Sequence, residues 1–190
     1  GDSKMSKRIR NKLIKYSDLI LTHSEELAIE MKGKCNLLYH PFQNNSSINK
    51  VNITNEQDIL IWGTISKYKG ILEFIKYAKS TNQFDNKKIL IAGKFIDLNY
   101  YKLVLENCPK NIIIRNELIP EDELVKLIKS SSFILFTYNS TSIQSSGALN
   151  FTLPLNHNII GPNTGDFRIF NSKGFIKAYS KYEDIIELMR

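Results

Sequence analysis

The sequence predicts an α/β fold, a Rossmann-like parallel sheet with helices on both faces. Short apolar runs rich in Ile, Leu and Val alternate along the chain with longer stretches of helical periodicity, as they do in βα units. Several of these runs, such as ILIW and KILIAG, carry apolar residues on both strand faces. That pattern is typical of a parallel sheet covered by helices on each side.

The predicted elements follow one another in a regular order. The expected strands are short and apolar, and they lie at 18–23, 36–40, 58–63, 88–93, 111–115, 133–137, 158–161 and 175–179. The expected helices have apolar residues at helical spacing, and they lie at 7–16, 24–31, 69–80, 100–107, 121–130, 145–152 and 181–189. Pro120 followed by Glu121, Asp122 and Glu123 indicates a helix start rather than a metal site, because the carboxylates face the positive end of the helix dipole.

One stretch, residues 41–57, lacks periodicity and is polar and turn-rich. It divides the chain, so we expect residues 1–42 to be the tail end of a preceding domain and 43–57 to be a loop or linker. Residues 58–190 are then a single Rossmann-like domain, a size at which one core suffices.

Composition excludes several classes of protein. With 42% hydrophobic and 24% charged residues the chain is an ordinary globular sequence, and no apolar run approaches the ~20 residues of a membrane-spanning helix. Cys35 and Cys108 lack metal-ligand spacing, so two reduced thiols and a cytoplasmic location are expected. The net charge of +7 suits an anionic partner, whether nucleotide diphosphate, lipid phosphate or nucleic acid, but lysines spread over solvated helix faces are the favoured explanation.

Two predicted strand ends resemble phosphate-binding junctions. Gly63 follows one strand, where it permits close approach of the backbone to a ligand, and Lys69 is expected at the start of the next helix, beside its free N–H groups. The segment lacks the Walker A and GxGxxG patterns, so a simple turn with solvated lysines is the alternative.

The second junction, residues 137–149, is rich in hydroxyl groups and then becomes a helix. Ser145 or Ser146 could cap that helix or donate to a phosphate or ribose oxygen, and Gly147 leaves the backbone of the first turn uncovered. A capped turn without a ligand is the alternative. Ligands of open parallel sheets bind at the carboxyl ends of the strands, so we expect the two junctions to meet at one pocket.

Other catalytic groups are poorly supported by the sequence. His23, His40 and His157 are isolated beside strand ends and are expected to be core or edge histidines rather than bases. No nucleophile elbow, HExxH or Asp-x-Asp motif is present, so no metal-bridged diphosphate is expected.

In five successive segments the chain resembles the group 1 retaining glycosyltransferases of GT-B fold. The segments are SDLILTHSEELAIEM, NLLYHPF, ILIWGTISKYKGILEFIKYAK, KILIAG and FILFTYNSTSIQSSGALNFTLPLNHNIIGPNTGDF. The resemblance implies that residues 1–42 are the end of the acceptor domain with its crossing segment. Residues 58–190 would be the nucleotide-sugar-binding domain, and most of the acceptor domain would be missing from this chain.

The resemblance also implies roles for individual residues. Lys69 takes the position of the family's lysine that contacts the donor diphosphate, and it is the expected catalytic residue. The other expected donor-binding residues are Gly63, Thr64, Asn139, Ser145, Ser146 and Gly147. Three of these depart from the family: Thr64 replaces an arginine, and Asn139 and Gly147 replace two glutamates.

The implied reaction is transfer of a sugar from a nucleoside diphosphate to a saccharide or lipid-linked acceptor, with retention and no obligatory metal, in polysaccharide biosynthesis. The expected partners are the nucleotide-sugar donor and the acceptor, with peripheral contact to the inner membrane face and no nucleic acid. One alternative is a non-catalytic nucleotide-sugar-binding or scaffold module, indicated by the missing charged residues. Another is a nucleic-acid-binding domain, indicated only by a pI of 9.3.

Overall fold

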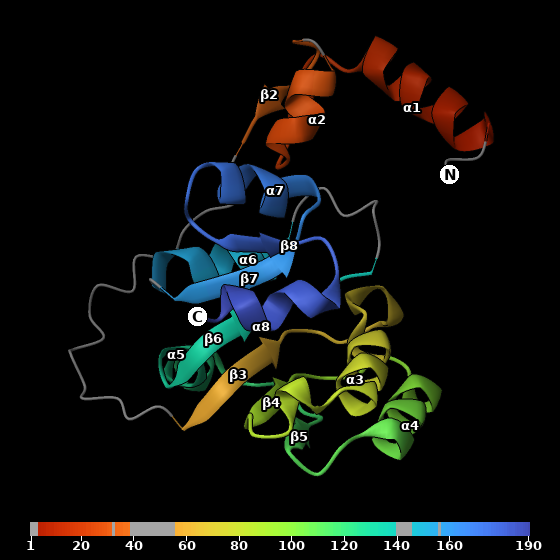
Figure 1. Cartoon of the computed structure of the whole chain (residues 1–190). Coiled ribbons are helices and arrows are strands. Elements are labelled where there is room, and N and C mark those ends of the chain that lie inside the picture. The colour runs from red at the N-terminus through yellow and green to blue at the C-terminus, as the bar shows by residue number, and fades with distance from the viewer. Residues whose placement is uncertain (1–3, 32, 39–55, 140–145, 156) are drawn as a thin grey trace. The chain divides into compact units, whose positions relative to one another are not determined.

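The structure is a computed structural model that describes all residues except 1–3, 32, 39–55, 140–145 and 156 (Figure 1). The chain forms two compact units, Gly1–Pro41 and Phe42–Arg190, which are described separately. Within the described part of the chain, no helix has both the length and the apolar character needed to cross a bilayer.

The first unit contains two helices and a pair of very short strands. The helices are α1 (Lys4–Tyr16) and α2 (Glu25–Glu30), and β1 (Leu21–Thr22) pairs in parallel with β2 (Asn36–Leu37). Ser24 caps α2 by accepting a hydrogen bond from the Leu27 amide at 3.2 Å. The strand predicted at 18–23 is shorter in the structure, because only two of its residues pair with another strand.

The second unit contains a parallel sheet with the strand order β5-β4-β3-β6-β7-β8. Its strands are β3 (Gln57–Trp62), β4 (Ile89–Ala92), β5 (Ile112–Arg115), β6 (Ser131–Leu135), β7 (Asn158–Pro162) and β8 (Lys177–Tyr179). Each lies within two residues of a predicted strand at both ends. The fold class predicted from the sequence is therefore confirmed.

Helices cover both faces of this sheet (Figure 1). They are α3 (Ile71–Ser80), α4 (Leu98–Asn107), α5 (Glu121–Lys129), α6 (Gly147–Thr152), α7 (Gly165–Ser172) and α8 (Ile185–Leu188). Helices α3, α4 and α8 share one buried cluster with Ile59 and Ile61, and α5, α6 and α7 share the other with Leu60 and Trp62. Consecutive residues of β3 thus point to opposite sides, which is why the strand is apolar at successive positions.

The strand order places a topological switch point at the centre of the sheet. From β3 the chain proceeds outward through β4 and β5, then crosses back to β6 and proceeds to the other edge. The connections after β3 and β6 consequently leave the sheet in opposite directions and open a crevice at the carboxyl ends of these two strands, where ligands of such sheets bind.

Helices α7, α3 and α8 differ from the prediction. The helix predicted at 181–189 begins at Ile185, because Tyr182–Asp184 form a 3-10 turn. Helix α7 was not predicted, because the stretch GDFRIFNS is short and its apolar residues do not repeat over several turns. The helix predicted from Lys69 begins at Ile71 instead, since Lys67–Lys69 form a 3-10 turn and Gly70 follows in the left-handed conformation with φ 67°.

Candidate functional site

The two loops singled out in the sequence meet at the switch point. The Thr137 hydroxyl donates a hydrogen bond to the Lys69 carbonyl oxygen at 2.6 Å, and the Asn139 amide donates to the Tyr68 carbonyl oxygen at 3.1 Å. Residues nearly 70 positions apart are joined in this way because β3 and β6 are neighbours in the sheet. The loops after these strands therefore form one wall with a fixed geometry.

Lys69 is buried in this wall, with 5% of its surface exposed. Its ammonium donates a hydrogen bond to the Tyr138 hydroxyl at 3.0 Å and lies 4.8 Å from the centre of the Tyr138 ring. Among the described residues, no carboxylate forms an ion pair with it. A buried cation without a counter-ion is expensive, so this position favours an anionic ligand.

Burial also alters the protonation of this side chain. Removal from water lowers the pKa of the Lys69 ammonium to about 8, and the neighbouring Tyr68 acts in the opposite direction. Lys69 is thus still mostly charged at neutral pH, but it is held in a site that favours the charged form less than water does.

Ser146 lies on the other side of the Tyr138 hydroxyl, at 2.9 Å between the two oxygens. It is buried, and its Oγ accepts a hydrogen bond from the Leu149 amide at 3.2 Å, which caps α6. The capping role predicted for Ser145 or Ser146 falls to Ser146. Ser145 lies outside the described residues.

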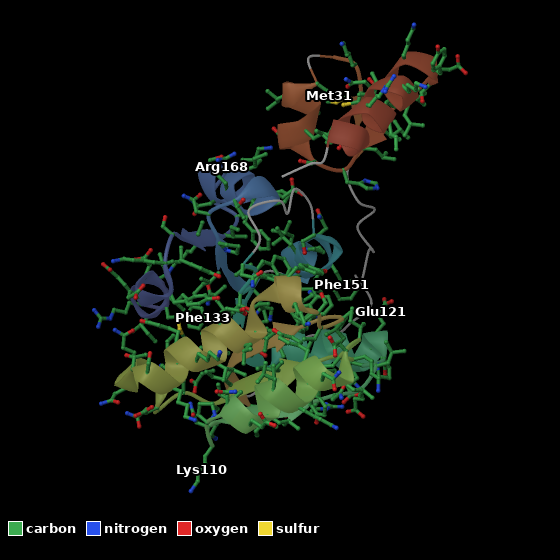
Figure 2. The ribbon with its side chains drawn as sticks, turned by 90° about the vertical axis from the view of Figure 1, so that its right-hand side faces the viewer. Met31, Lys110, Glu121, Phe133, Phe151 and Arg168 are labelled. Carbon is green, nitrogen blue, oxygen red and sulfur yellow. The ribbon has the colours of Figure 1, made fainter. Side chains whose placement is uncertain are left out.

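These groups open onto a pocket of about 460 Å³, a volume within the usual range of small-molecule sites. Lys69, Tyr68, Tyr138 and Ser146 form one side of it, and apolar and acidic residues from other elements form the rest. Those residues include Trp62, Ile119, Glu121, Leu124 and Phe151. Figure 2 labels Phe151 from α6 and Glu121 from the start of α5, which lie close together in that view. Trp62 meets Phe151 edge to face, with ring centres 5.5 Å apart.

Gly63 leaves room for the ammonium. Its φ is 114°, and a Cβ added there would lie 2.9 Å from the Lys69 Nζ. A side chain at this position would be strained and would also displace the cation. Gly63 was predicted to permit close approach of a ligand, and in the structure the group that lies close to it is the Lys69 ammonium.

The remaining predicted site residues do not all share this pocket. Thr64 and Gly147 line it and are exposed, and a Cβ added to Gly147 would meet no atom within 4 Å. Asn139 lines a neighbouring cavity of about 570 Å³ formed by the ends of β6, β7 and β8. Tyr138 lines both cavities and so separates them.

At the N-terminus of α3, a protein group already bonds one amide of the first turn. The Leu72 amide in its first turn donates to the Tyr100 hydroxyl at 3.1 Å, so a protein group occupies this donor. The helix starts two residues after Lys69, so the ammonium belongs to the 3-10 turn and not to the first turn of α3.

Tyr138 and Glu121 are among the pocket residues that the sequence analysis did not predict as site residues. Tyr138 stands in the loop that was examined, but its neighbours in the sequence do not indicate a contact with Lys69. Glu121 was interpreted only as part of a helix start, where it is indeed found, and it also faces the pocket. An aromatic residue directly after a predicted buried strand, in a loop rich in hydroxyl groups, is the signal that could have indicated Tyr138.

The histidines lie elsewhere. The His23 Nδ1 lies 2.6 Å from the Leu38 carbonyl oxygen, and His157 has a pKa lowered by burial and by Lys129. His40 lies outside the described residues. Within the described ranges, no cluster of three His, Cys, Asp or Glu side chains is arranged to hold a metal ion.

Comparison with known proteins shows the fold. No protein-family model matches the chain, and no curated protein is significantly similar to it in sequence. Among solved structures, the Anabaena protein HepE in complex with UDP and glucose matches with a TM-score of 0.71 and 12% identity, over 99% of this chain and 57% of that one. WaaG, a glycosyltransferase involved in lipopolysaccharide biosynthesis, matches with a TM-score of 0.69 and 10% identity, over 99% and 58%.

A shorter solved protein matches as well. It is the C-terminal domain of a glycosyl transferase group 1 family protein from Francisella tularensis, with a TM-score of 0.54 and 18% identity, over 72% of this chain and 74% of that one. The resemblance drawn from the sequence is thus confirmed at the level of the fold. The chain spans less than two thirds of the length of HepE and of WaaG.

Proposed function

We propose that this chain carries the donor site of a glycosyltransferase and binds the nucleoside diphosphate of a sugar donor in the pocket around Lys69. The whole protein would transfer the sugar, with retention and without an obligatory metal, to a saccharide or lipid-linked acceptor in polysaccharide biosynthesis. We place the reaction in the cytoplasm, with peripheral contact to the inner membrane face, which the net charge of +7 would favour.

The observation that carries this proposal is the buried Lys69 ammonium, which has no carboxylate partner among the described residues. A diphosphate supplies the missing negative charge, and its oxygens accept hydrogen bonds from an ammonium well. The position at the switch point of a parallel sheet supports the same assignment.

The rest of the pocket suits the remainder of a nucleotide. Trp62, Ile119, Leu124 and Phe151 offer apolar surface for a base or ribose, and Glu121 offers an acceptor for hydroxyl groups. Ser146 and Thr64 bring hydroxyl groups to the Lys69 side of the pocket, where they would donate to phosphate oxygens. Gly147 leaves the start of α6 open to the ligand.

Lys69 would contribute to catalysis electrostatically. Charge builds on the departing diphosphate as the glycosidic bond breaks, so a fixed cation stabilises the transition state more than the ground state. By analogy with the loss of an oxyanion-hole donor, losing this cation would raise the barrier by about 2 to 4 kcal/mol.

Nucleotide binding tests the proposal directly. Isothermal titration calorimetry of this chain with UDP, GDP and ADP should give saturable binding of at least one of them at pH 7. Lys69→Ala should weaken that binding about 10- to 100-fold, the loss expected for a hydrogen bond to a charged group.

Lys67→Ala is the matched control. It removes a lysine from the same 3-10 turn, but the Lys67 side chain is 74% exposed and pairs with Asp97 at 3.4 Å. The affinity of the Lys67→Ala variant for the nucleotide should stay near that of the wild type. Absence of binding by every nucleotide, or equal losses in both variants, would count against the proposed site.

A second candidate function is a non-catalytic nucleotide-sugar-binding or scaffold module. It is favoured by Gly147, which brings no carboxylate to the pocket, and by Asn139, whose neutral side chain lines the adjacent cavity instead. The full-length protein separates the two functions: a scaffold would bind nucleotide but transfer no sugar from any member of a donor panel.

A further inference from the structure

Among the described residues, the Tyr138 hydroxyl forms hydrogen bonds with both Lys69 and Ser146. The ammonium can only donate, so the tyrosine oxygen accepts from it. The tyrosine proton is then free to be donated to the Ser146 Oγ. Either hydroxyl can donate in the contact between Tyr138 and Ser146. When Tyr138 donates, the Ser146 Oγ accepts from both Tyr138 and the Leu149 amide, and the Ser146 proton is left for another acceptor.

An anion in the pocket would select one direction for this chain of hydrogen bonds, with Tyr138 donating to Ser146 and Ser146 donating to the anion. Of the three ammonium protons of Lys69, one is used by Tyr138, and the other two remain available, as does the Ser146 proton. All three side chains line the same pocket, and each is more than nine-tenths buried. The arrangement presents donors from two distant loops to one place, and among the described residues no carboxylate forms an ion pair with Lys69.

We propose that Tyr138 is a positioning residue, whose hydroxyl holds the Lys69 ammonium and orients the Ser146 hydroxyl so that both donate to the same anionic group, a diphosphate. This inference rests on the proposed function, since it names how the same site recognises its ligand. It goes beyond that function by assigning a role to a residue that need not touch the donor itself.

The ring and the hydroxyl of Tyr138 contribute separately. The ring packs against Phe136, with centres 5.8 Å apart, and against Phe167, with centres 5.5 Å apart, so it is held from the core side. Phenylalanine would keep these contacts and the ring surface beneath the ammonium. Tyr138→Phe therefore removes only the hydrogen-bonding group, and the variant should fold.

Loss of the hydroxyl should also change the protonation of Lys69. The titratable groups around the ammonium, within the described residues, are Tyr138, Tyr68 of the same turn and Glu121 across the pocket on α5. The Tyr138 oxygen accepts a stronger hydrogen bond from the charged form of Lys69 than from the neutral amine, so it stabilises the charged form. Without it, the pKa of Lys69 should fall further below about 8.

The experiment is a titration of this chain with UDP, GDP and ADP at several pH values between 6 and 9.5, for the wild type, Tyr138→Phe and Tyr179→Phe. Tyr179 is the matched control, because it is equally buried and its hydroxyl donates to the Phe136 carbonyl oxygen at 3.1 Å rather than to the Lys69 pocket. Thermal unfolding of each variant, followed by circular dichroism, checks that it is folded.

We expect Tyr138→Phe to bind the nucleotide roughly tenfold more weakly at pH 7, the effect of losing about one strong hydrogen bond. The pH above which affinity falls should also move to lower values, whereas Tyr179→Phe should keep both the affinity and the pH profile. An unchanged profile in Tyr138→Phe, with or without weaker binding, would overturn the positioning role. Failure of the wild type to bind any nucleotide would instead overturn the proposed function, and this inference with it.

Discussion

At the scale of single residues, the buried charge of Lys69 lowers the stability of the free protein. Lys69 is charged and buried, and the groups that surround it are hydroxyl groups and a ring rather than carboxylates. A lowered pKa means that folding disfavours the charged form, so Lys69 destabilises the free protein at neutral pH. A bound anion would relieve this cost. A buried ionisable group with a shifted pKa is typical of a functional site.

Lys69→Met should therefore stabilise the free chain. Methionine has a similar length and no charge to bury, so we expect the free energy of unfolding at pH 7 to rise by about 1 to 3 kcal/mol. Chemical denaturation of both proteins measures this difference. The same variant should lose nucleotide binding.

The gain should depend on pH in a defined direction. The folded-state pKa of Lys69, about 8, lies below the unfolded value of 10.5, so above pH 8 the unfolded chain binds more protons and the wild type gains stability. The advantage of Lys69→Met should consequently shrink as the pH rises from 8 towards 10. A constant difference across this range would show that the ammonium is not the cause.

At the scale of elements, the 3-10 turn before α3 determines where the cation lies. Gly70 ends this turn in the left-handed conformation, and a Cβ there would overlap the Thr137 carbonyl oxygen. The turn thus lies directly against the loop that follows β6, and this close approach allows the Lys69 side chain to reach Tyr138.

Gly70→Ala should destabilise the chain by at least about 3 kcal/mol. The left-handed conformation costs an alanine about 1 to 2 kcal/mol, and displacement of the Thr137 backbone adds to it. Gly174→Ala is the control, because Gly174 has a similar φ of 77° but a Cβ there would meet nothing within 4 Å. Its cost should not exceed about 2 kcal/mol in the same denaturation experiment. Equal costs would mean that the contact with Thr137 is unimportant.

At the scale of the whole molecule, we expect nucleotide binding and sugar transfer to depend on different parts of the protein. HepE and WaaG are both longer than this chain, which covers 57% of HepE and 58% of WaaG. That residues 1–42 are the end of an acceptor domain, joined by a linker at 43–57 to the domain at 58–190, stays a prediction. If it holds, most groups that bind the acceptor lie outside this chain.

We therefore expect this chain to bind a nucleoside diphosphate without transferring sugar. The measurement is release of free nucleotide from a panel of nucleotide sugars with saccharide acceptors, compared between this chain and the full-length protein. Acceptor-dependent release by the full-length protein alone would fit the proposal. Turnover by this chain would refute the division of the site between two domains.

Much of the fold could be predicted from the sequence, because the signals are local. Strands buried on both faces, such as β3 and β4, are apolar at successive positions whatever lies beside them. Helix α7 was missed because its pattern is too short to repeat, and the start of α3 was misplaced because the role of Gly70 depends on its contact with Thr137. The two loops of the site were predicted from their glycine, lysine and serine residues, and so was their meeting at one edge of the sheet.

The sequence alone therefore determined the layers of the fold and the loops in which a ligand could be bound. Only the tertiary structure decided how those loops act together: Tyr138 and Lys69 are 69 positions apart, and they touch because β3 and β6 are adjacent in the sheet. Burial at this place lowers the pKa of the ammonium, and Asn139 lines the neighbouring cavity instead of the pocket. Burial and hydrogen-bond direction depend on neighbours that are distant in the sequence, so no local pattern could have revealed them.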